Sequence, residues 1–186
     1  MARANELIKL TYRDYLLLPE DSRYELIEGD LFMVPSPNEL HQRISKRLEY
    51  ELITFVEDRE LGEIYDAPFD VVLSTHNVVQ PDILFVARER RGIITDKNIQ
   101  GAPDLIIEIL SPGTSDRDLI VKRTLYAKYG VKEYWIVDPV AESIEICRLA
   151  QSGMETFQVY LKENTLKSPL LPGLELNLTK IFKPRK

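Results

Sequence analysis

The chain has 186 residues, a formal net charge of −6 and 44% hydrophobic residues. This composition predicts one globular domain over residues 1–186 and excludes a disordered or fibrous chain. Its one cysteine, Cys147, excludes an internal disulfide, and one cysteine with two histidines is too few for a structural zinc site. We see no signal peptide and no apolar run of membrane-spanning length, so we expect a cytoplasmic protein without membrane contact.

The first third of the chain predicts a short helix, a hairpin and a long helix. Thr11 is a suitable N-cap for a helix that Pro19 ends. Apolar runs on both sides of a glycine turn at residues 28–30 predict a β-hairpin. Residues 36–39 match a capping box with proline at the first helical position. We therefore expect a helix that begins there and ends near Glu60.

The middle of the chain predicts three strands. Residues 63–73 and 78–86 have the composition of two strands joined by a turn, and Pro68 favours an edge or a bulge in the first. Residues 88–102 are polar and charged and predict a connection. Residues 103–110 are almost continuously apolar, which is typical of a strand buried on both faces.

The last third predicts a helix over about residues 115–129, stopped by Gly130, and a strand at residues 133–137. Residues 143–149 and 156–161 predict a hairpin, and the proline-containing tail is expected to be mostly irregular. The order of elements predicts an α/β (α+β) fold with one central mixed β-sheet flanked by helices.

Two carboxylates interrupt the apolar strands, Asp82 in the second and Glu108 in the third. A buried carboxylate is costly unless a metal, a cation or hydrogen bonds compensate it. If the strands are neighbours, Asp82 and Glu108 can converge on one divalent ion, because Mg²⁺ commonly takes one or two carboxylates with waters and phosphates. The ordinary alternative for Asp82 is a turn cap or a pair with an arginine.

Lys122 is the candidate cation for this site. Leu110 occupies the position two residues after Glu108, where the strand could have carried a lysine. Lys122 lies four residues after Asp118 and four before Tyr126, so these three residues share a helix face. The alternative is that Lys122 only pairs with Asp118 on an exposed face, which contributes little.

The residues around Asp82, Glu108 and Lys122 resemble motifs of a known group of proteins. Pro81-Asp82 followed by Glu108-Ile109-Leu110 resembles the PD-(D/E)xK nuclease-like superfamily, with Leu110 in place of the usual lysine. More closely, the chain resembles the Uma-type restriction endonuclease family over nearly its whole length. That resemblance is carried by residues 24–29, His41, residues 80–82, residues 103–112, Asp118, Lys122, Tyr126 and residues 130–139. Its most specific part is the run from residue 103 to residue 139.

The resemblance implies a restriction-endonuclease-like fold and a homodimer that hydrolyses DNA phosphodiester bonds with Mg²⁺, for which Mn²⁺ can substitute. By position, Asp82 and Glu108 would be metal ligands, with the backbone carbonyl of Ile109 as a third. Lys122 would orient or activate the attacking water, or stabilise the phosphate in the transition state.

Other polar residues are candidates of a second rank. They are Glu25, His41, Asp70, Gln80, Asp118 and Tyr126. His41 has an equal claim as a packed helix residue, and Glu25 and Asp70 as solvated carboxylates. Arginines of two basic clusters are expected to rim the cleft and bind phosphates, with a solvated surface as the alternative; these are Arg88, Arg90, Arg91 and Arg123.

Three functions compete at this point. The first is a Mg²⁺-dependent DNA endonuclease. The second is a nuclease-like fold kept as a binding or dimerisation module without catalysis, which the acidic net charge and the absent strand lysine favour. The third is a metal-dependent hydrolase of a smaller phosphate ester, which would need a closed, narrow pocket.

Overall fold

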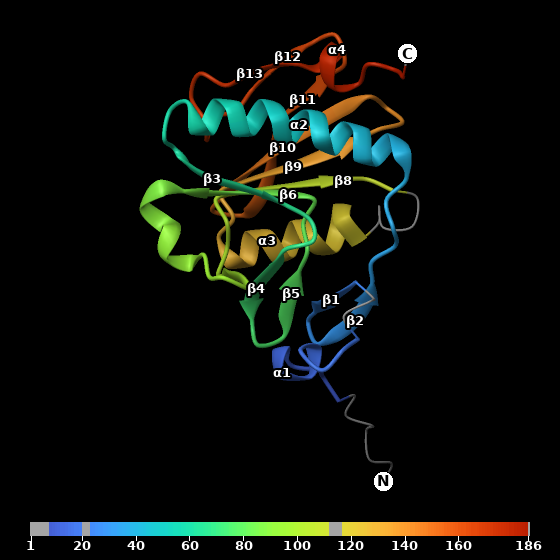
Figure 1. The fold of residues 1–186 in the computed structure, drawn as a ribbon, viewed down its shortest axis with the longest axis vertical. Coiled ribbons are helices and arrows are strands. Elements are labelled where there is room, and N and C mark those ends of the chain that lie inside the picture. Colours follow the sequence, from blue (N-terminus) through green and yellow to red (C-terminus); the bar gives the residue numbers. More distant parts are fainter. Residues whose placement is uncertain (1–7, 20–22, 112–116, 186) are drawn as a thin grey trace.

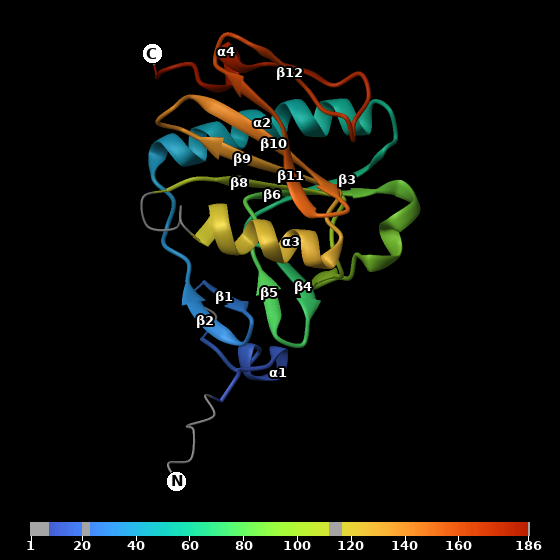
Figure 2. The same ribbon diagram turned by 180° about the vertical axis from the view of Figure 1, so that it is seen from behind.

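Helices cover both faces of a central mixed sheet. The computed structural model describes residues 8–19, 23–111 and 117–185, with side chains in the last range from residue 120. Within these ranges there are a six-stranded, a five-stranded and a two-stranded sheet. Figures 1 and 2 show α2 (Glu39–Glu57) on one face of the six-stranded sheet. α3 (Arg123–Tyr129) lies on the other face, on the side of the five-stranded sheet. The predicted fold class is therefore confirmed.

The six-stranded sheet has the order β11-β10-β9-β8-β6-β3. Its strands are β3 (Gly62–Asp66), β6 (Ile83–Ala87), β8 (Leu105–Ile109), β9 (Glu133–Asp138), β10 (Ser143–Ala150) and β11 (Gly153–Leu161). β8 and β9 are parallel, and the other neighbours are antiparallel. β8 is therefore an interior strand, as its apolar sequence predicts.

Successive side chains of β8 point to opposite faces of the sheet, so they pack alternately toward α2 and toward α3. Leu105, Ile107 and Ile109 lie in the hydrophobic cluster that includes the buried face of α2. Ile106 lies in the opposite cluster with Leu125 and Tyr126 of α3. The same alternation turns Glu108 toward α3.

α2 begins two residues later than the first helical position predicted from the sequence. It starts at Glu39, and the side chain of its N-cap, Asn38, accepts a hydrogen bond from the backbone N–H of His41. Asparagine is as good an N-cap as serine, and here it provides the acceptor expected of Ser36. The buried stripe of Ile44, Leu48 and Leu52 is as predicted.

Each of the two long strands predicted in the middle of the chain divides between two sheets. Residues 63–73 form β3 and β4 (Asp70–Ser74), and residues 78–86 form β5 (Asn77–Val79) and β6. The breaks lie around Pro68 and Pro81, which have no backbone N–H to donate to a ladder. β4 and β5 join the five-stranded sheet, of order β2-β1-β5-β4-β7, while β3 and β6 pair in the other.

The five-stranded sheet contains the predicted hairpin and one strand that was not predicted. β1 (Tyr24–Ile27) and β2 (Asp30–Met33) pair in antiparallel register. Residues 88–102, expected to be a connection, contain the 3₁₀ helix η1 (Arg88–Ile93) and β7 (Asn98–Gln100), which pairs in parallel with β4. A short helix, α1 (Tyr12–Tyr15), precedes the sheet with Thr11 as N-cap.

The region before Gly130 forms two helical segments in place of one helix. A π-helical segment, η2 (Arg117–Lys122), continues directly into α3. Gly130 ends α3 with φ of 84°, in the left-handed region that glycine favours at a helix C-terminus. The predicted helix start near residue 115 lies outside the described residues.

The tail is more ordered than its prolines predict. It forms β12 (Thr165–Lys167), β13 (Glu175–Asn177) and α4 (Leu178–Ile181). Its apolar residues, among them Leu166, Leu176 and Ile181, are buried in the cluster that includes α2. Burial of these leucines and isoleucines supplies the energy that orders the segment.

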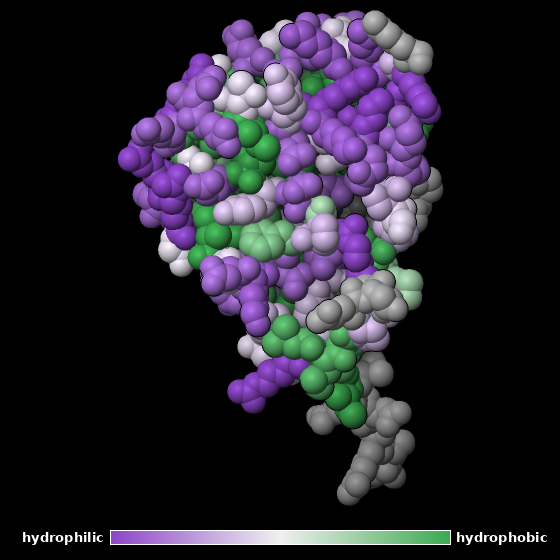
Figure 3. Space-filling view, in the orientation of Figure 1, coloured by the Kyte–Doolittle hydropathy of each residue, from purple (hydrophilic) through white to green (hydrophobic). Residues whose placement is uncertain are grey.

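The surface is mostly polar on the face shown in Figure 3, with apolar residues exposed in several places, one of them the lower end, where Figure 1 shows α1. Leu16 and Leu17 are exposed in this region. In the described part of the chain, no helix combines the length and the hydrophobicity needed to cross a bilayer.

Candidate active site

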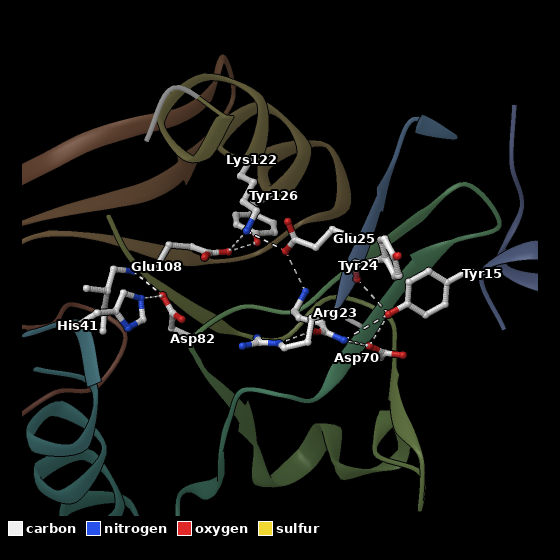
Figure 4. A network of polar contacts seen from close by, with 12 residues as sticks. Tyr15, Arg23, Tyr24, Glu25, His41, Asp70, Asp82, Glu108, Lys122 and Tyr126 are labelled. Atoms are coloured by element: carbon white, nitrogen blue, oxygen red, sulfur yellow. Dashed lines mark hydrogen bonds and ion pairs between the residues drawn. The ribbon is translucent and has the colours of Figure 1, made fainter. Parts of the chain in front are cut away.

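The three residues predicted to be catalytic line one hollow of about 50 Å³. Asp82, Glu108 and Lys122 border it together with Ile109, and its other walls include Glu25, His41 and Gln80. Figure 4 shows the carboxylates of Asp82, Glu108 and Glu25 together with His41 and Lys122, which come from separate elements. The division of residues 78–86 into β5 and β6 explains this geometry, because Gln80 and Asp82 lie where the chain passes between the sheets.

Asp82 is held at the start of β6 by two partners. Its Oδ2 accepts a hydrogen bond from the backbone N–H of Ile109 at 2.8 Å. The same oxygen lies 3.1 Å from Nε2 of His41. Among the described residues nothing hydrogen-bonds Asp82 Oδ1, so one carboxylate oxygen is fixed while the other remains available to a ligand. His41 is therefore a neighbour of Asp82, although its ring is also largely buried.

Glu108, Lys122, Tyr126 and Glu25 form a buried cluster. Lys122 Nζ lies 2.8 Å from Oε1 of Glu108 and 2.8 Å from Oε1 of Glu25. The hydroxyl of Tyr126 donates to Glu108 Oε1 at 2.6 Å. The exposed fractions of Glu25, Glu108 and Lys122 are 1%, 4% and 3%. Lys122 thus reaches the site from η2, one helical turn before Tyr126.

The charges of this cluster compensate one another. Two carboxylates share one lysine, and a buried carboxylate without such a partner would be strongly unfavourable. Burial and the neighbouring Glu108 carboxylate raise the pKa of Tyr126 well above its ordinary value. The Tyr126 hydroxyl therefore stays protonated and acts as a donor that fixes one oxygen of Glu108.

Gln80 belongs to the wall of the site on the side of the five-stranded sheet, and Asp70 lies behind it. The backbone N–H of Gln80 donates to Glu25 Oε1 at 3.0 Å, which ties the start of the β6 segment to β1. Asp70 does not line the hollow; its Oδ1 accepts from the side-chain amide of Gln80 at 2.8 Å. The side chain of Asp118 lies outside the described residues.

The residues around the hollow fit a divalent cation of the magnesium type. They provide the carboxylates of Asp82 and Glu108 on neighbouring strands, and the main chain of Ile109 beside them. Mg²⁺ needs no more than one or two protein carboxylates, because water and phosphate oxygens complete its octahedron. Among the described residues no group of three or more His, Cys, Asp or Glu side chains is placed to hold a metal. A site made only of protein ligands, as zinc prefers, is therefore not formed in the described part of the chain.

The predicted phosphate-binding arginines are not brought to this hollow. Arg88 pairs with Glu60 at 3.0 Å and Arg91 with Glu63 at 2.6 Å, and both arginines line a separate hollow. Two further arginines are also engaged elsewhere, Arg90 with buried Asp104 and Arg123 with Glu145. None of these four arginines borders the hollow in the described part of the chain, because the fold places an acidic residue beside each of them. Sequence clusters of arginine do not indicate which acidic residues these will be.

Among the charged residues that the structure places at the hollow, Arg23 is the one that was not predicted. It directly precedes the 24–29 motif, which was the only signal near it. Its place depends on the pairing of β1 with β5, which brings Arg23 beside Gln80. That pairing links residues more than fifty positions apart and cannot be deduced from local pattern.

Comparisons with known proteins identify a family and a fold for this chain. A family model described as "Uma2: Putative restriction endonuclease" matches residues 12–179. Five chains of solved structures match. One is a crystal structure from Anabaena variabilis ATCC 29413, described as "a putative nuclease belonging to DUF820". It has a TM-score of 0.79 and 24% sequence identity, and the match covers 93% of this chain and 97% of that chain.

No curated protein matches the chain. The likeness to the Anabaena structure shows a shared fold, and the family model runs from α1 to the start of α4 and includes every described residue of the hollow. The chain therefore belongs to the Uma2 restriction endonuclease family.

Proposed function

We propose that this protein is a Mg²⁺-dependent endonuclease that hydrolyses phosphodiester bonds of DNA. The observation that carries the proposal is the position of Lys122 Nζ, 2.8 Å from Glu108 in the hollow that Asp82 also lines. β8 is followed by Leu110 and not by a lysine. In this proposal Lys122, from the helical segment that follows, supplies the missing cation. Membership of the family supports the same reaction class.

In this proposal Asp82 and Glu108 hold the metal, with the carbonyl of Ile109 as a third ligand. The bound ion would lower the pKa of a water and neutralise charge on the phosphate, with Mn²⁺ as a substitute. The Ile109 N–H and His41 orient Asp82 through one oxygen, and Tyr126 orients Glu108 in the same way. Residues of this chain therefore fix both carboxylates before any ligand binds, which lowers the cost of organising the site.

Lys122 acts in this proposal as an electrostatic group. Its Nζ lies 2.8 Å from a carboxylate oxygen of Glu25 and 2.8 Å from one of Glu108. We assign it the tasks of donating a hydrogen bond to the attacking water and stabilising negative charge on the phosphate. Glu25 holds it in place from β1.

The size of the hollow limits what enters it. A volume of about 50 Å³ suits an ion with its waters or part of a phosphate, and is too small for a nucleotide. DNA would therefore lie across the opening with only a phosphate inserted. The same size favours a second candidate function, hydrolysis of a smaller phosphate ester.

Cleavage of both strands of a duplex requires two such sites facing opposite strands. We propose that a homodimer with two-fold symmetry provides them, in the cytoplasm where DNA and Mg²⁺ are both present. Multi-angle light scattering of the purified chain tests the dimer.

The function is tested by incubating the protein with supercoiled plasmid in Mg²⁺ or Mn²⁺, and in parallel with bis(4-nitrophenyl) phosphate. We expect nicking by the wild type and its loss in Asp82→Asn, Glu108→Gln and Lys122→Met. Glu60→Gln is the matched control, because Glu60 is an exposed carboxylate paired with Arg88 outside the hollow. A melting curve for each variant separates loss of chemistry from loss of fold.

Nicking that persists unchanged in Asp82→Asn would exclude this site. Turnover of the small ester without plasmid cleavage would favour the second candidate. DNA binding without turnover of either substrate would identify a non-catalytic binding module.

A further inference from the structure

A second hollow adjoins the first on the side of α2. It has a volume of about 90 Å³ and shares Arg23, Pro37, His41 and Asp82 with the first. The walls that belong to it alone come from the first turns of α2 and the end of β3, including Ser45 and Lys46. Asp82 and Arg23 therefore stand at the junction of two adjacent cavities, and a chain of phosphates that extended from the first hollow into the second would pass both residues.

Arg23 faces this junction without an ionic partner in the described part of the chain. Its Nε donates to the side-chain oxygen of Gln80 at 3.0 Å, and Gln80 is neutral. Figure 4 shows the guanidinium extending from the start of β1 toward Asp82. The other arginines discussed above are all paired with carboxylates. Arg23 thus combines a fixed Nε with two terminal nitrogens that no described carboxylate neutralises.

Gln80 is itself held in one orientation. Its side-chain nitrogen donates to Asp70 Oδ1 at 2.8 Å and to the hydroxyl of Tyr15 at 3.3 Å. Tyr15 also donates to Asp70 Oδ1, at 2.9 Å. Because the amide nitrogen faces a carboxylate, the amide oxygen must face Arg23. A half-buried network from α1 and β4 therefore aims the arginine.

This inference rests on the proposed nuclease function. We propose that Arg23 binds the phosphate next to the scissile phosphate, on the same DNA strand. Gln80, Asp70 and Tyr15 are its positioning residues. With Nε used by Gln80, the terminal nitrogens of the guanidinium present donors to a phosphate, a geometry for which arginine is suited. The substrate strand would run from the first hollow across Arg23 toward the start of α2.

The charges that line the second hollow favour phosphate binding at Arg23 over binding at the end where Lys46 lies. Lys46 is exposed there, but Glu49 and Asp66 line the same end and repel a phosphate. We therefore assign the main contact to Arg23 and only a weak one to Lys46.

The test measures binding of a fluorescent DNA duplex in Ca²⁺, by anisotropy across a range of salt concentrations. We expect Arg23→Gln to weaken binding about tenfold at low salt and to lower the salt slope by about one, as for one lost phosphate contact. Arg23→Lys keeps the charge, so it should keep the slope while losing part of the affinity. Gln80→Leu should behave like Arg23→Lys, because it removes the support and leaves the charge.

The matched control is Arg88→Gln, which removes an arginine that is paired with Glu60 and lines another hollow. It should change neither affinity nor slope. Wild-type affinity and slope in a folded Arg23→Gln variant would overturn the inference, as would an equal loss in Arg88→Gln.

This result is separable from the test of the nuclease. Plasmid cleavage with normal DNA binding by Arg23→Gln would leave the nuclease and remove the inference. Loss of binding in Arg23→Gln, in a protein that cleaves nothing, would keep the phosphate contact and remove the nuclease.

Discussion

Replacing Lys122 by methionine removes the cation that lies 2.8 Å from both Glu25 and Glu108, and keeps a side chain of similar length. The two carboxylates are 1% and 4% exposed, so water cannot easily take the place of the ammonium. Removing one partner of a buried ion pair costs about 3–5 kcal/mol. For a domain of this size, that corresponds to a fall in Tm of roughly 6–20 °C.

The assay is urea denaturation followed by circular dichroism in EDTA, for the wild type and Lys122→Met. The double variant Lys122→Met with Glu25→Gln should recover part of the loss, because one of the two uncompensated carboxylates is then neutral. Addition of Mg²⁺ should stabilise Lys122→Met more than the wild type, because the site has become more negative and the metal binds only the folded state.

A Lys122→Met variant within about 1 kcal/mol of the wild type in EDTA would refute this reasoning. It would mean that the cluster is open to solvent and that Lys122 contributes no more than a surface ion pair. Failure of the Glu25→Gln substitution to recover stability would remove Glu25 from the cluster.

Three further predictions concern other parts of the fold. Burial and the Asp66 carboxylate raise the pKa of Glu49, so the folded state binds the Glu49 proton more tightly than the unfolded state. Stability is therefore lost as the pH rises from the ordinary glutamate pKa through the raised pKa of the folded state. Glu49→Gln should therefore raise Tm at pH 7 and have no effect below the ordinary glutamate pKa, as melting curves from pH 3.5 to 7 will show; an equal effect at both ends would contradict this cause. Burial and the Glu145 carboxylate raise the pKa of Cys147 to about 12, so the thiol should react with Ellman's reagent only after denaturation, and rapid native labelling would show that it is accessible. Leu176→Ala should cost about 2–5 kcal/mol in urea denaturation because this tail residue is buried, whereas Leu161→Ala, on an exposed edge strand, should cost little; equal effects would mean that the tail is not part of the core.

Local pattern predicted the elements that depend on short-range physics. The apolar run before Ser111 predicted β8, the glycine turn at residues 28–30 predicted the β1–β2 hairpin, and the apolar stripe of α2 predicted its buried face. The carboxylate in an otherwise apolar strand was also informative. Burial of Glu108 has an energetic cost, and the compensation it required is present in Lys122 and Tyr126.

What local pattern missed depends on contacts between distant residues. The division of two predicted strands between two sheets follows from the pairing of β5 with β1 and β4, and of β6 with β3 and β8. Burial of the tail follows from the apolar face of α2 that it covers, and this face lies more than a hundred residues earlier. Arg23 lines the hollow, whereas the clustered arginines lie elsewhere beside carboxylates such as Glu60 and Glu63.

Calorimetric titration of the metal-free protein with Mn²⁺ tests whether Asp82 and Glu108 form a divalent metal site. Metal binding depends on this chain alone, whereas cleavage also depends on finding the right DNA. We predict one saturable site per chain in the wild type, weakened at least tenfold in Asp82→Asn and unchanged in Asp66→Asn, a carboxylate of the neighbouring hollow. Equal Mn²⁺ affinity in the wild type and Asp82→Asn, or no binding by the wild type, would show that Asp82 and Glu108 do not form this metal site.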